Sequence, residues 1–211
     1  DDTLKERFKG EMKFLRAFGH FHLVRLFGEI PLHLVAVEGP TNAFSEKSSV
    51  DEVYTAIIQD LKDASNTLPV KYGSGDVGRV TKGAALTMLG DVYLTRKQYS
   101  DAVTALQEVT TFGYALMSNY ADCFDPNAKN NAESIFEVQY DQAIEGENSN
   151  FIYMFGPIDG RVKLVGFTGN LGGSNIPTPS IYNAYENGDT RKDKSISLFD
   201  DPTSLNYPES V

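Results

Sequence analysis

The sequence predicts a mostly α-helical protein built on tetratricopeptide-like helix pairs, with loop-rich insertions and little β-structure. The first 113 residues contain four segments with apolar side chains at three- and four-residue spacing, which indicates amphipathic helices. Within them, Leu89-Gly90 followed by Tyr93 is typical of a tetratricopeptide helix pair. A chain of 211 residues with 41% hydrophobic content is also long enough to bury a sizeable core.

The first helix is predicted over residues 3–27, ending at Gly28 before Pro31. Its apolar positions include Leu4, Phe8, Met12, Leu15 and Phe18, followed by a dense aromatic end. Because apolar side chains occur around the whole helix, we expect it to be deeply buried.

The second helix is predicted over residues 50–68, between the capping box of Ser49 and Glu52 and the terminating Pro69. Its apolar side chains recur at helical spacing: Val50, Val53, Tyr54, Ile57, Ile58, Leu61, Ala64 and Leu68. The pattern predicts one buried face.

The third and fourth helices are predicted over residues 81–96 and 100–112, with Ser100 as N-cap and Gly113 closing the fourth in a left-handed turn. The tetratricopeptide pattern falls on Leu86, Leu89, Gly90, Tyr93, Ala102 and Leu106. A glycine inside a helix costs about 1 kcal/mol relative to alanine. We therefore interpret Gly90 as the point where the two helices approach closely.

The second half of the chain is less regular. Residues 134–140 alternate in polarity and predict a short strand, and residues 141–176 are rich in Gly, Asn, Ser and aromatic side chains. Helical order is predicted again from Thr178-Pro179 to Gly188. The alternating charges Asp189, Arg191 and Asp193 follow, and a structural role is favoured for them.

Composition excludes several classes of partner. The net charge of −10 and the lack of a Lys/Arg cluster argue against nucleic acid and against an anionic membrane surface. The one cysteine, Cys123, cannot form an internal disulfide, and no Cys/His cluster predicts a zinc site. No stretch has the roughly 20 apolar residues needed to cross a bilayer.

The sequence predicts neither an enzyme nor a metal or cofactor site. His20 and His22 point to different sides of a helix, and His33 stands alone. Two carboxylates about 5–10 Å apart could hydrolyse glycosides, but no spacing pairs the candidates Asp141, Glu145, Glu147 and Asp159. There is no GxSxG motif, and residues 169–173 lack the GK[ST] of a phosphate loop.

Residues 140–170 are the predicted ligand-binding loop. Sugar rings stack on aromatic side chains, and their hydroxyls bond to Asn, Asp and Arg, so a glycan site needs both kinds of residue. The candidate contacts are Tyr140, Phe151, Tyr153, Phe155, Arg161, Phe167 and Asn170. The alternative is that these aromatic side chains fix the loop onto the helical core. The chain has no tryptophan, so a site here depends on Tyr and Phe.

Four segments follow one another along the chain: EMKFLRAFGHFHLVRLFGEIPL (11–32), GRVTKGAALTMLGDVYLTRKQYSDAVTALQEV (78–109), ESIFEVQY (133–140) and PTPSIYNAYENGDTRKDKSI (177–196). In this order they resemble the SusD/RagB family of outer-membrane nutrient-binding lipoproteins from Bacteroidetes. The most specific are FLRA followed by LVRLFGxIPL, and the proline-started helix ending in GDxRxD.

The resemblance implies part of a single SusD-like α-α superhelix across residues 1–211. Residues 3–139 would be the helical scaffold with a short strand, 140–176 the ligand-side insertion, and 177–211 the start of the family's C-terminal segment. It further implies a cell-surface protein that binds oligosaccharide or polysaccharide for polysaccharide utilisation. The partner would be a SusC-like TonB-dependent transporter, and a lipid anchor outside this chain would hold the protein at the outer membrane.

Family members are usually about twice this length or more, on the size scale of large single domains. We therefore expect N- and C-terminal parts to lie outside the sequence, which also opens at Asp1 without a signal peptide. Two alternatives stay open: the same fold binding peptide or another nutrient, and a tetratricopeptide-type scaffold for a protein partner.

Overall fold

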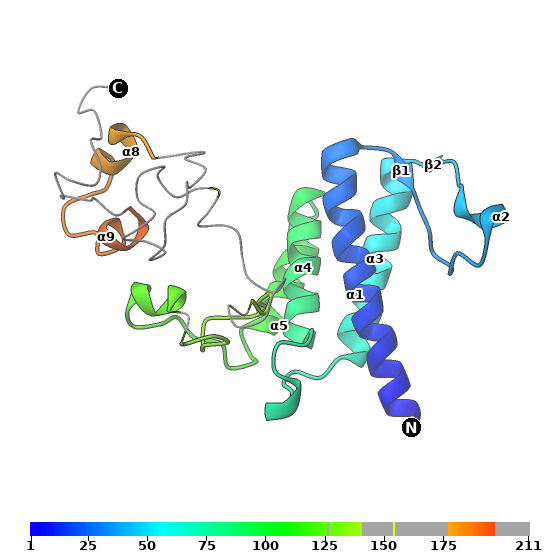
Figure 1. Cartoon of the computed structure of the whole chain (residues 1–211), viewed down its shortest axis with the longest axis horizontal. Helices are drawn as coiled ribbons and strands as arrows, with labels where there is room; N and C mark the ends of the chain where they lie inside the picture. Colours follow the sequence, from blue (N-terminus) through cyan, green and yellow to red (C-terminus); the bar gives the residue numbers. More distant parts are fainter. Residues whose placement is uncertain (126, 141–153, 155–176, 197–211) are drawn as a thin grey trace, which may run out of the picture. The chain divides into compact units, whose positions relative to one another are not determined.

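The computed structural model describes residues 1–125, 127–140, 154 and 177–196 of the chain. It divides into two compact units (Figure 1). The first unit comprises Asp1–Leu116 and Asn130–Glu137. The second comprises Met117–Lys129 and the described part of Val138–Val211. Helices predominate among the described residues, which confirms the predicted mostly α-helical class.

Four long helices form the first unit: α1 (Asp2–Phe27), α3 (Val50–Thr67), α4 (Lys82–Thr95) and α5 (Tyr99–Val109). Each packs mainly on the next in chain order, as in stacked helix pairs (Figure 1). The connection from α1 to α3 carries α2 (Pro40–Ala43) and a small antiparallel sheet of β1 (Ile30–Pro31) and β2 (Lys47–Ser48). The connection from α3 to α4 carries a short 3-10 turn, η1 (Ser74–Asp76).

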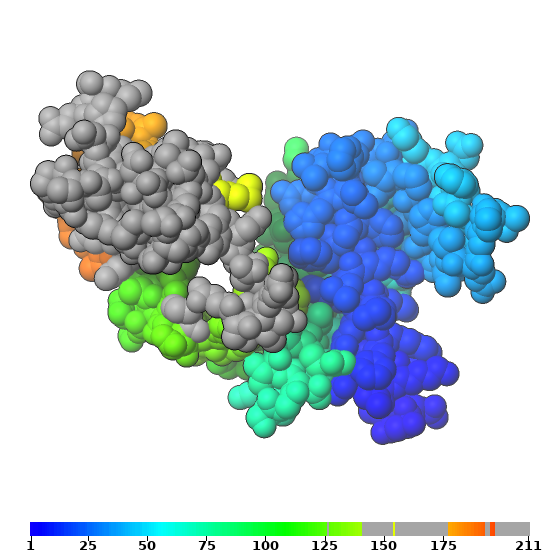
Figure 2. All heavy atoms as spheres, viewed as in Figure 1, coloured from blue at the N-terminus to red at the C-terminus, as the bar shows by residue number. Residues whose placement is uncertain are grey.

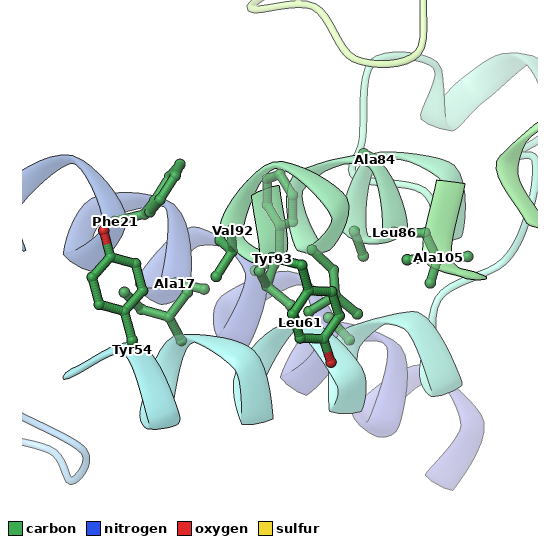
Figure 3. Close-up of a cluster of buried hydrophobic side chains, with 14 of the residues drawn as sticks. Ala17, Phe21, Tyr54, Leu61, Ala84, Leu86, Val92, Tyr93 and Ala105 are labelled. Atoms are coloured by element: carbon green, nitrogen blue, oxygen red, sulfur yellow. The ribbon is translucent and has the colours of Figure 1, made fainter. Parts of the chain in front are cut away.

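The hydrophobic core lies between these four helices (Figure 3). Its fully buried larger side chains are Val53, Ile57 and Leu61 of α3 and Val92 of α4. The capping box predicted for α3 is present, because the Ser49 side chain accepts from the Glu52 amide and Glu52 accepts from the Ser49 amide. The periodicity of residues 50–68 thus gives the buried face that it predicts.

Gly90 lies where α4 and α5 come closest together. A Cβ atom built on Gly90 would lie 2.6 Å from both Cγ and Cδ2 of Leu106. Ala102 and Ala105 of α5 are buried as well. This confirms the interpretation of Gly90 as a contact point between the paired helices.

The expectation that α1 is buried on all sides is wrong. Its core-facing residues are Gly10, Glu11, Phe14, Ala17, Phe21 and Val24. The other apolar side chains are exposed: Leu4 (41%), Phe8 (43%), Met12 (58%), Leu15 (48%) and Phe18 (40%). Among the described residues, α3 packs most extensively on this helix, and α4 and β1 make smaller contacts, so one face of it stays exposed, where its blue spheres are visible in Figure 2.

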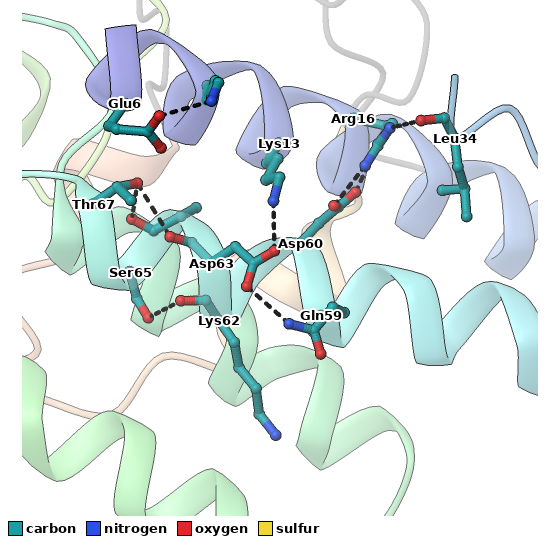
Figure 4. A network of polar contacts seen from close by, with 12 residues as sticks. Glu6, Lys13, Arg16, Leu34, Gln59, Asp60, Lys62, Asp63, Ser65 and Thr67 are labelled. Carbon is teal, nitrogen blue, oxygen red and sulfur yellow. Dashed lines mark hydrogen bonds and ion pairs between the residues drawn. The ribbon is translucent and has the colours of Figure 1, made fainter. Parts of the chain in front are cut away.

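Two ion pairs join α1 to α3 (Figure 4). Arg16 donates from Nε and Nη2 to the buried carboxylate of Asp60, at 2.8 and 2.7 Å, and from Nη1 to the Leu34 carbonyl at 2.7 Å. Lys13 pairs with Asp63 at 2.5 Å. Burial and the nearby Arg16 lower the pKa of His20. These contacts fix α1 on α3 and hold the start of the α1–α3 connection against it.

The fourth helix begins earlier than predicted. Lys97 adopts a left-handed φ of 59°, and Gln98 N donates to the Tyr93 carbonyl at 2.8 Å, which closes α4 in a Schellman-type turn. Helix α5 starts at once, with Gln98 as N-cap and Ser100 inside the helix. It ends at Val109, although Gly113 does have the predicted left-handed φ of 85°.

The predicted strand over residues 134–140 is absent from the structure. Ile135 and Phe136 both pack on the core, and the Phe136 ring lies edge-on to Phe14 with centroids 5.4 Å apart. Adjacent side chains on the same side are incompatible with the alternation of a strand. The apolar residues of this segment therefore belong to a loop that packs on the helices.

The second unit contains η2 (Tyr120–Phe124), α8 (Pro179–Asn183) and α9 (Lys192–Ser195) among its described residues. Helix α8 has Thr178 at the N-cap position and the predicted Pro179 start, but the Thr178 side chain makes no capping hydrogen bond. The helix ends at Asn183 instead of near Gly188. Asp189 accepts from the Arg191 amide and guanidinium, and these hydrogen bonds lower the pKa of Asp189 to about 2. Such a turn-stabilising pair agrees with the structural role predicted for this motif.

Within the described ranges, every helix is too short or too polar to cross a membrane.

Candidate ligand-binding cavity

A cavity of about 460 Å³ lies in the first unit. Three segments that are distant in sequence line it: part of the α3–α4 connection (70–81), the residues after α5 (112–114), and the segment 130–137. Its volume lies within the roughly 300–1,000 Å³ typical of small-molecule sites. All of these segments belong to one compact unit.

Four aromatic residues line the cavity: Tyr72, Phe112, Tyr114 and Phe136. Tyr114 packs on Gly83 so closely that a Cβ atom there would collide with the Tyr114 hydroxyl and ring. The same hydroxyl lies 3.4 Å from Thr81 Oγ1. Because Gly83 has no side chain, the Tyr114 ring can lie this close to α4.

A buried carboxylate fixes the α3–α4 connection. Glu11 of α1 is 7% exposed, and its two carboxylate oxygens accept from Nε and Nη2 of Arg79, each at 3.1 Å. The Tyr72 hydroxyl donates to Glu11 Oε1, also at 3.1 Å. Burial, and then the neighbouring Glu11, raise the pKa of Tyr72 to about 12. The arrangement holds Tyr72 and Arg79, which both line the cavity, at fixed positions.

Backbone hydrogen bonds hold the segment 130–137 in place. Asn130 has a left-handed φ of 53°, and its amide donates to both carboxylate oxygens of Glu137 at 3.1 Å. The Ala132 carbonyl accepts from the Ala115 amide at 3.0 Å, which attaches the segment to the chain after α5. Asn131 and Ser134 also line the cavity. Residues with amide and hydroxyl groups thus lie beside aromatic residues, the two kinds that a sugar site combines.

Within the part of the chain that the structure describes, no group of three or more His, Cys, Asp or Glu side chains is placed to hold a metal ion. The His22 ring instead lies edge-on to Phe18, with ring centroids 4.6 Å apart. The carboxylates considered for glycoside hydrolysis and the glycine-rich stretch 169–173 lie outside the described residues.

Of the predicted ligand contacts, the structure describes only Tyr140. This residue is 50% exposed in the second unit, and its carbonyl accepts from Lys129 Nζ at 2.6 Å. The remaining six candidates, Phe151, Tyr153, Phe155, Arg161, Phe167 and Asn170, lie outside the described residues.

None of the cavity-lining residues is among the ligand contacts predicted from the sequence. Tyr72 and Tyr114 each lie next to a glycine, Gly73 and Gly113, just beyond the end of a helix. An aromatic residue beside a glycine after a helix is the one local signal that could have indicated them. Phe136 was included in the predicted strand, which concealed its contact with α1.

Comparison with known proteins identifies the family. A SusD-like family model, described as starch-binding associating with outer membrane, matches residues 1–94. SusD-like protein P2 of Formosa agariphila is 29% identical over 189 residues, which is 87% of this chain and 37% of the relative. The crystal structure of a SusD-like protein from Bacteroides fragilis is similar with a TM-score of 0.71 and 32% identity, over 88% of this chain and 36% of that one. The chain belongs to the SusD-like family.

A laminarin-binding SusD-like protein is also similar, with 36% identity and a TM-score of 0.63 over 66% of this chain and 32% of the relative. The SusD-like chain thus spans about a third of the length of the relatives that it matches. The predicted family and the predicted fold are both confirmed. The family description is that of a binding protein associated with the outer membrane, in agreement with the expectation that the chain is not an enzyme.

Proposed function

We propose that this SusD-like chain is part of a glycan-binding protein at the cell surface. It captures oligosaccharide or polysaccharide and passes it to a SusC-like TonB-dependent transporter, without cleaving it. The outer-membrane association in the description of the family model supports this location. The laminarin-binding relative supports a glycan as the class of ligand.

The observation that carries the proposal is the composition of the cavity. Aromatic residues (Tyr72, Phe112 and Tyr114) and polar residues (Asn131 and Ser134) line one hollow of about 460 Å³. Aromatic faces take the apolar side of a sugar ring, while amide and hydroxyl groups bind its hydroxyls. In this proposal the cavity forms part of the glycan site.

Residues 140–170 supply further ligand contacts in this proposal. The candidates are Tyr140, Phe151, Tyr153, Phe155, Arg161, Phe167 and Asn170. Their mixture of aromatic, guanidinium and amide groups has the same chemistry as the cavity lining. Exposure of the Tyr140 side chain leaves it accessible to a ligand.

The proposal is tested by isothermal titration calorimetry against plant, host and microbial oligosaccharides, laminarin fragments among them, with a peptide digest as comparator. Saturable heat with one glycan class is the expected result. Saturable binding of peptides alone would replace the proposal by peptide uptake with the same fold. Binding of neither would favour a tetratricopeptide-type scaffold for a protein partner.

The loop contacts are tested separately with Tyr153→Ala and Phe155→Ala. Loss of one stacked ring is expected to weaken binding of the selected glycan about tenfold. Phe44→Ala is a suitable control, because Phe44 is 90% exposed in the α1–α3 connection and outside the cavity lining. Unchanged affinity in both loop variants would remove the loop from the glycan site.

A further inference from the structure

Glu11 of α1 is a buried residue whose carboxylate binds two residues of the cavity lining. It accepts hydrogen bonds from Nε and Nη2 of Arg79 and from the Tyr72 hydroxyl, each at 3.1 Å. Tyr72 and Arg79 line the cavity, whereas Glu11 is outside the lining. Glu11 therefore contacts the cavity wall without forming part of it.

The burial of this carboxylate needs a physical reason. An unpaired buried charge is costly, and a well-paired one is often no more stabilising than an apolar side chain of similar size. The other buried carboxylate among the described residues, Asp60, joins α3 to Arg16 of α1, so helix packing accounts for it. The hydrogen-bond partners of Glu11 lie instead in the α3–α4 connection. Its effect therefore falls on that connection.

The α3–α4 connection has little regular structure of its own. Residues 68–81 are all described, and the one helical element among them is the three-residue turn η1. The same stretch contains the glycines Gly73, Gly75 and Gly78, and glycine restricts the backbone less than any other residue. Contacts from α1 therefore restrict this connection more than its own secondary structure does.

Arg7, one turn before Glu11 on α1, also contacts the connection. Its Cζ atom lies 5.3 Å from the centroid of the Tyr72 ring, and its Nη1 lies 3.5 Å from Asp76 Oδ2. A guanidinium over an aromatic face is attracted to the ring electrostatically. The Tyr72 side chain is thus held at its hydroxyl by Glu11 and on one ring face by Arg7. At most one face of this ring is left for a sugar.

We propose that Glu11 is the positioning residue of the glycan site: its hydrogen bonds hold Tyr72 and Arg79 in the orientation that binds the ligand. The inference rests on the proposed function, because it takes the cavity as part of the glycan site. Groups that are already fixed before a ligand arrives lose less conformational entropy on binding. Removal of the Glu11 carboxylate should therefore weaken binding, although Glu11 itself does not contact the ligand.

Glu11→Gln tests the proposal by calorimetry with the glycan that the wild type binds. Glutamine has nearly the shape of glutamate, but its amide nitrogen only donates, so it cannot accept from both nitrogens of Arg79. Affinity should fall about tenfold. Asp60→Asn is the matched control, because it neutralises the other buried carboxylate, whose partner Arg16 is outside the cavity lining. This control should keep the affinity of the wild type.

Urea denaturation of both variants distinguishes positioning from a general loss of stability. Each substitution leaves an arginine without its carboxylate partner, so both denaturation midpoints should fall. Glu11→Gln alone should also weaken glycan binding. An equal fall in affinity in Asp60→Asn would show that Glu11 acts through fold stability and would overturn the proposal.

The contact with Tyr72 can be followed without any ligand, by NMR of the protein with ¹³C-labelled tyrosine. The Cζ signal of Tyr72 reports the ionisation of its hydroxyl, whose pKa is raised to about 12 by burial and by Glu11. In Glu11→Gln this ionisation should begin at a lower pH, because the anionic neighbour is gone. Asp60→Asn should leave the titration of Tyr72 unchanged. The same titration in Glu11→Gln and in the wild type would disprove the contact and the proposal with it.

The outcomes separate the positioning role from the proposed function. If no glycan class binds the wild type, the proposed function fails and the positioning role of Glu11 fails with it. If the wild type and Glu11→Gln bind the glycan equally, the proposed function stands and the positioning role alone is wrong. Weaker binding by Glu11→Gln, with Asp60→Asn unchanged, supports both.

Discussion

Gly90 and Gly19 are both helical glycines, and the structure predicts opposite effects of alanine at the two positions. At Gly90 a Cβ atom would lie 2.6 Å from Leu106, whereas at Gly19 nothing lies within 4 Å. Gly90→Ala should lower the free energy of unfolding by about 1–2 kcal/mol, because overpacking outweighs the gain in helix propensity. Gly19→Ala should raise it by about 0.5–1 kcal/mol. Urea denaturation measures both values.

The cause of the Gly90 effect can be isolated by a double-mutant cycle. In a Leu106→Ala background the leucine side chain is gone, so Gly90→Ala should no longer be destabilising. A penalty of the same size in both backgrounds would show that the helix pair is not held by this contact.

Tyr72 gives a pH-dependent prediction. Its pKa is raised to about 12, so the folded protein keeps the phenolic proton at a pH where the unfolded chain, with a tyrosine pKa of about 10, has lost it. The stability from this group is complete below pH 10 and is lost as the pH rises towards 12. Tyr72→Phe should therefore lose less stability than the wild type over this range, measured by urea denaturation at each pH. Parallel losses would contradict the assigned contact with Glu11.

At the level of helices, the structure separates a true N-cap from an apparent one. The Ser49 side chain caps α3, whereas Ser100 lies inside α5. Ser49→Ala should cost about 1 kcal/mol of stability, because it leaves an amide of the first turn without its partner. Ser100→Ala should be neutral or slightly stabilising, because alanine favours helix interiors. Thermal unfolding measures the stability of the two variants. A similar loss of stability in both would disprove the assignment of Ser49 as the N-cap and Ser100 as a helical residue.

Helices whose start, buried face and end are all encoded within their own segment were predictable from the sequence. Helix α3 is one of them, because it has a capping box at its start, apolar residues at helical spacing, and a proline directly after its C-cap residue. The start of α5 was not predictable in this way, because the left-handed turn at Lys97 has no glycine to indicate it. The exposed side of α1 could not be predicted either, because burial depends on which other helices pack against it.

At the scale of the whole chain, the family was predictable because its motifs are contiguous in sequence. The cavity was not, because it joins residues 70–81, 112–114 and 130–137, which come together only through the packing of α3, α4 and α5. Tyr72 depends further on Glu11 of α1, 61 positions away. No pattern within a short stretch of sequence indicates that these distant segments lie together in the fold.

Filling the cavity tests its part in ligand binding. Ala132 is exposed and lines the cavity, so Ala132→Trp should occupy part of the hollow without disturbing the core. Affinity for the glycan selected by calorimetry should fall about tenfold or more. Ala36→Trp, at an exposed alanine in the α1–α3 connection, serves as control. Equal affinity of the two variants would exclude the cavity from the site.

Amide NMR of the protein can detect directly whether glycan binds at the cavity of the helical unit. On addition of the selected glycan, we expect the ¹H–¹⁵N signals of Asn131, Ala132 and Ser134 to shift with one saturable affinity. The signals of Met12 on α1 and Val103 on α5 should stay in place. Saturable binding that leaves the amide signals of residues 130–137 unshifted would place the glycan site outside this cavity.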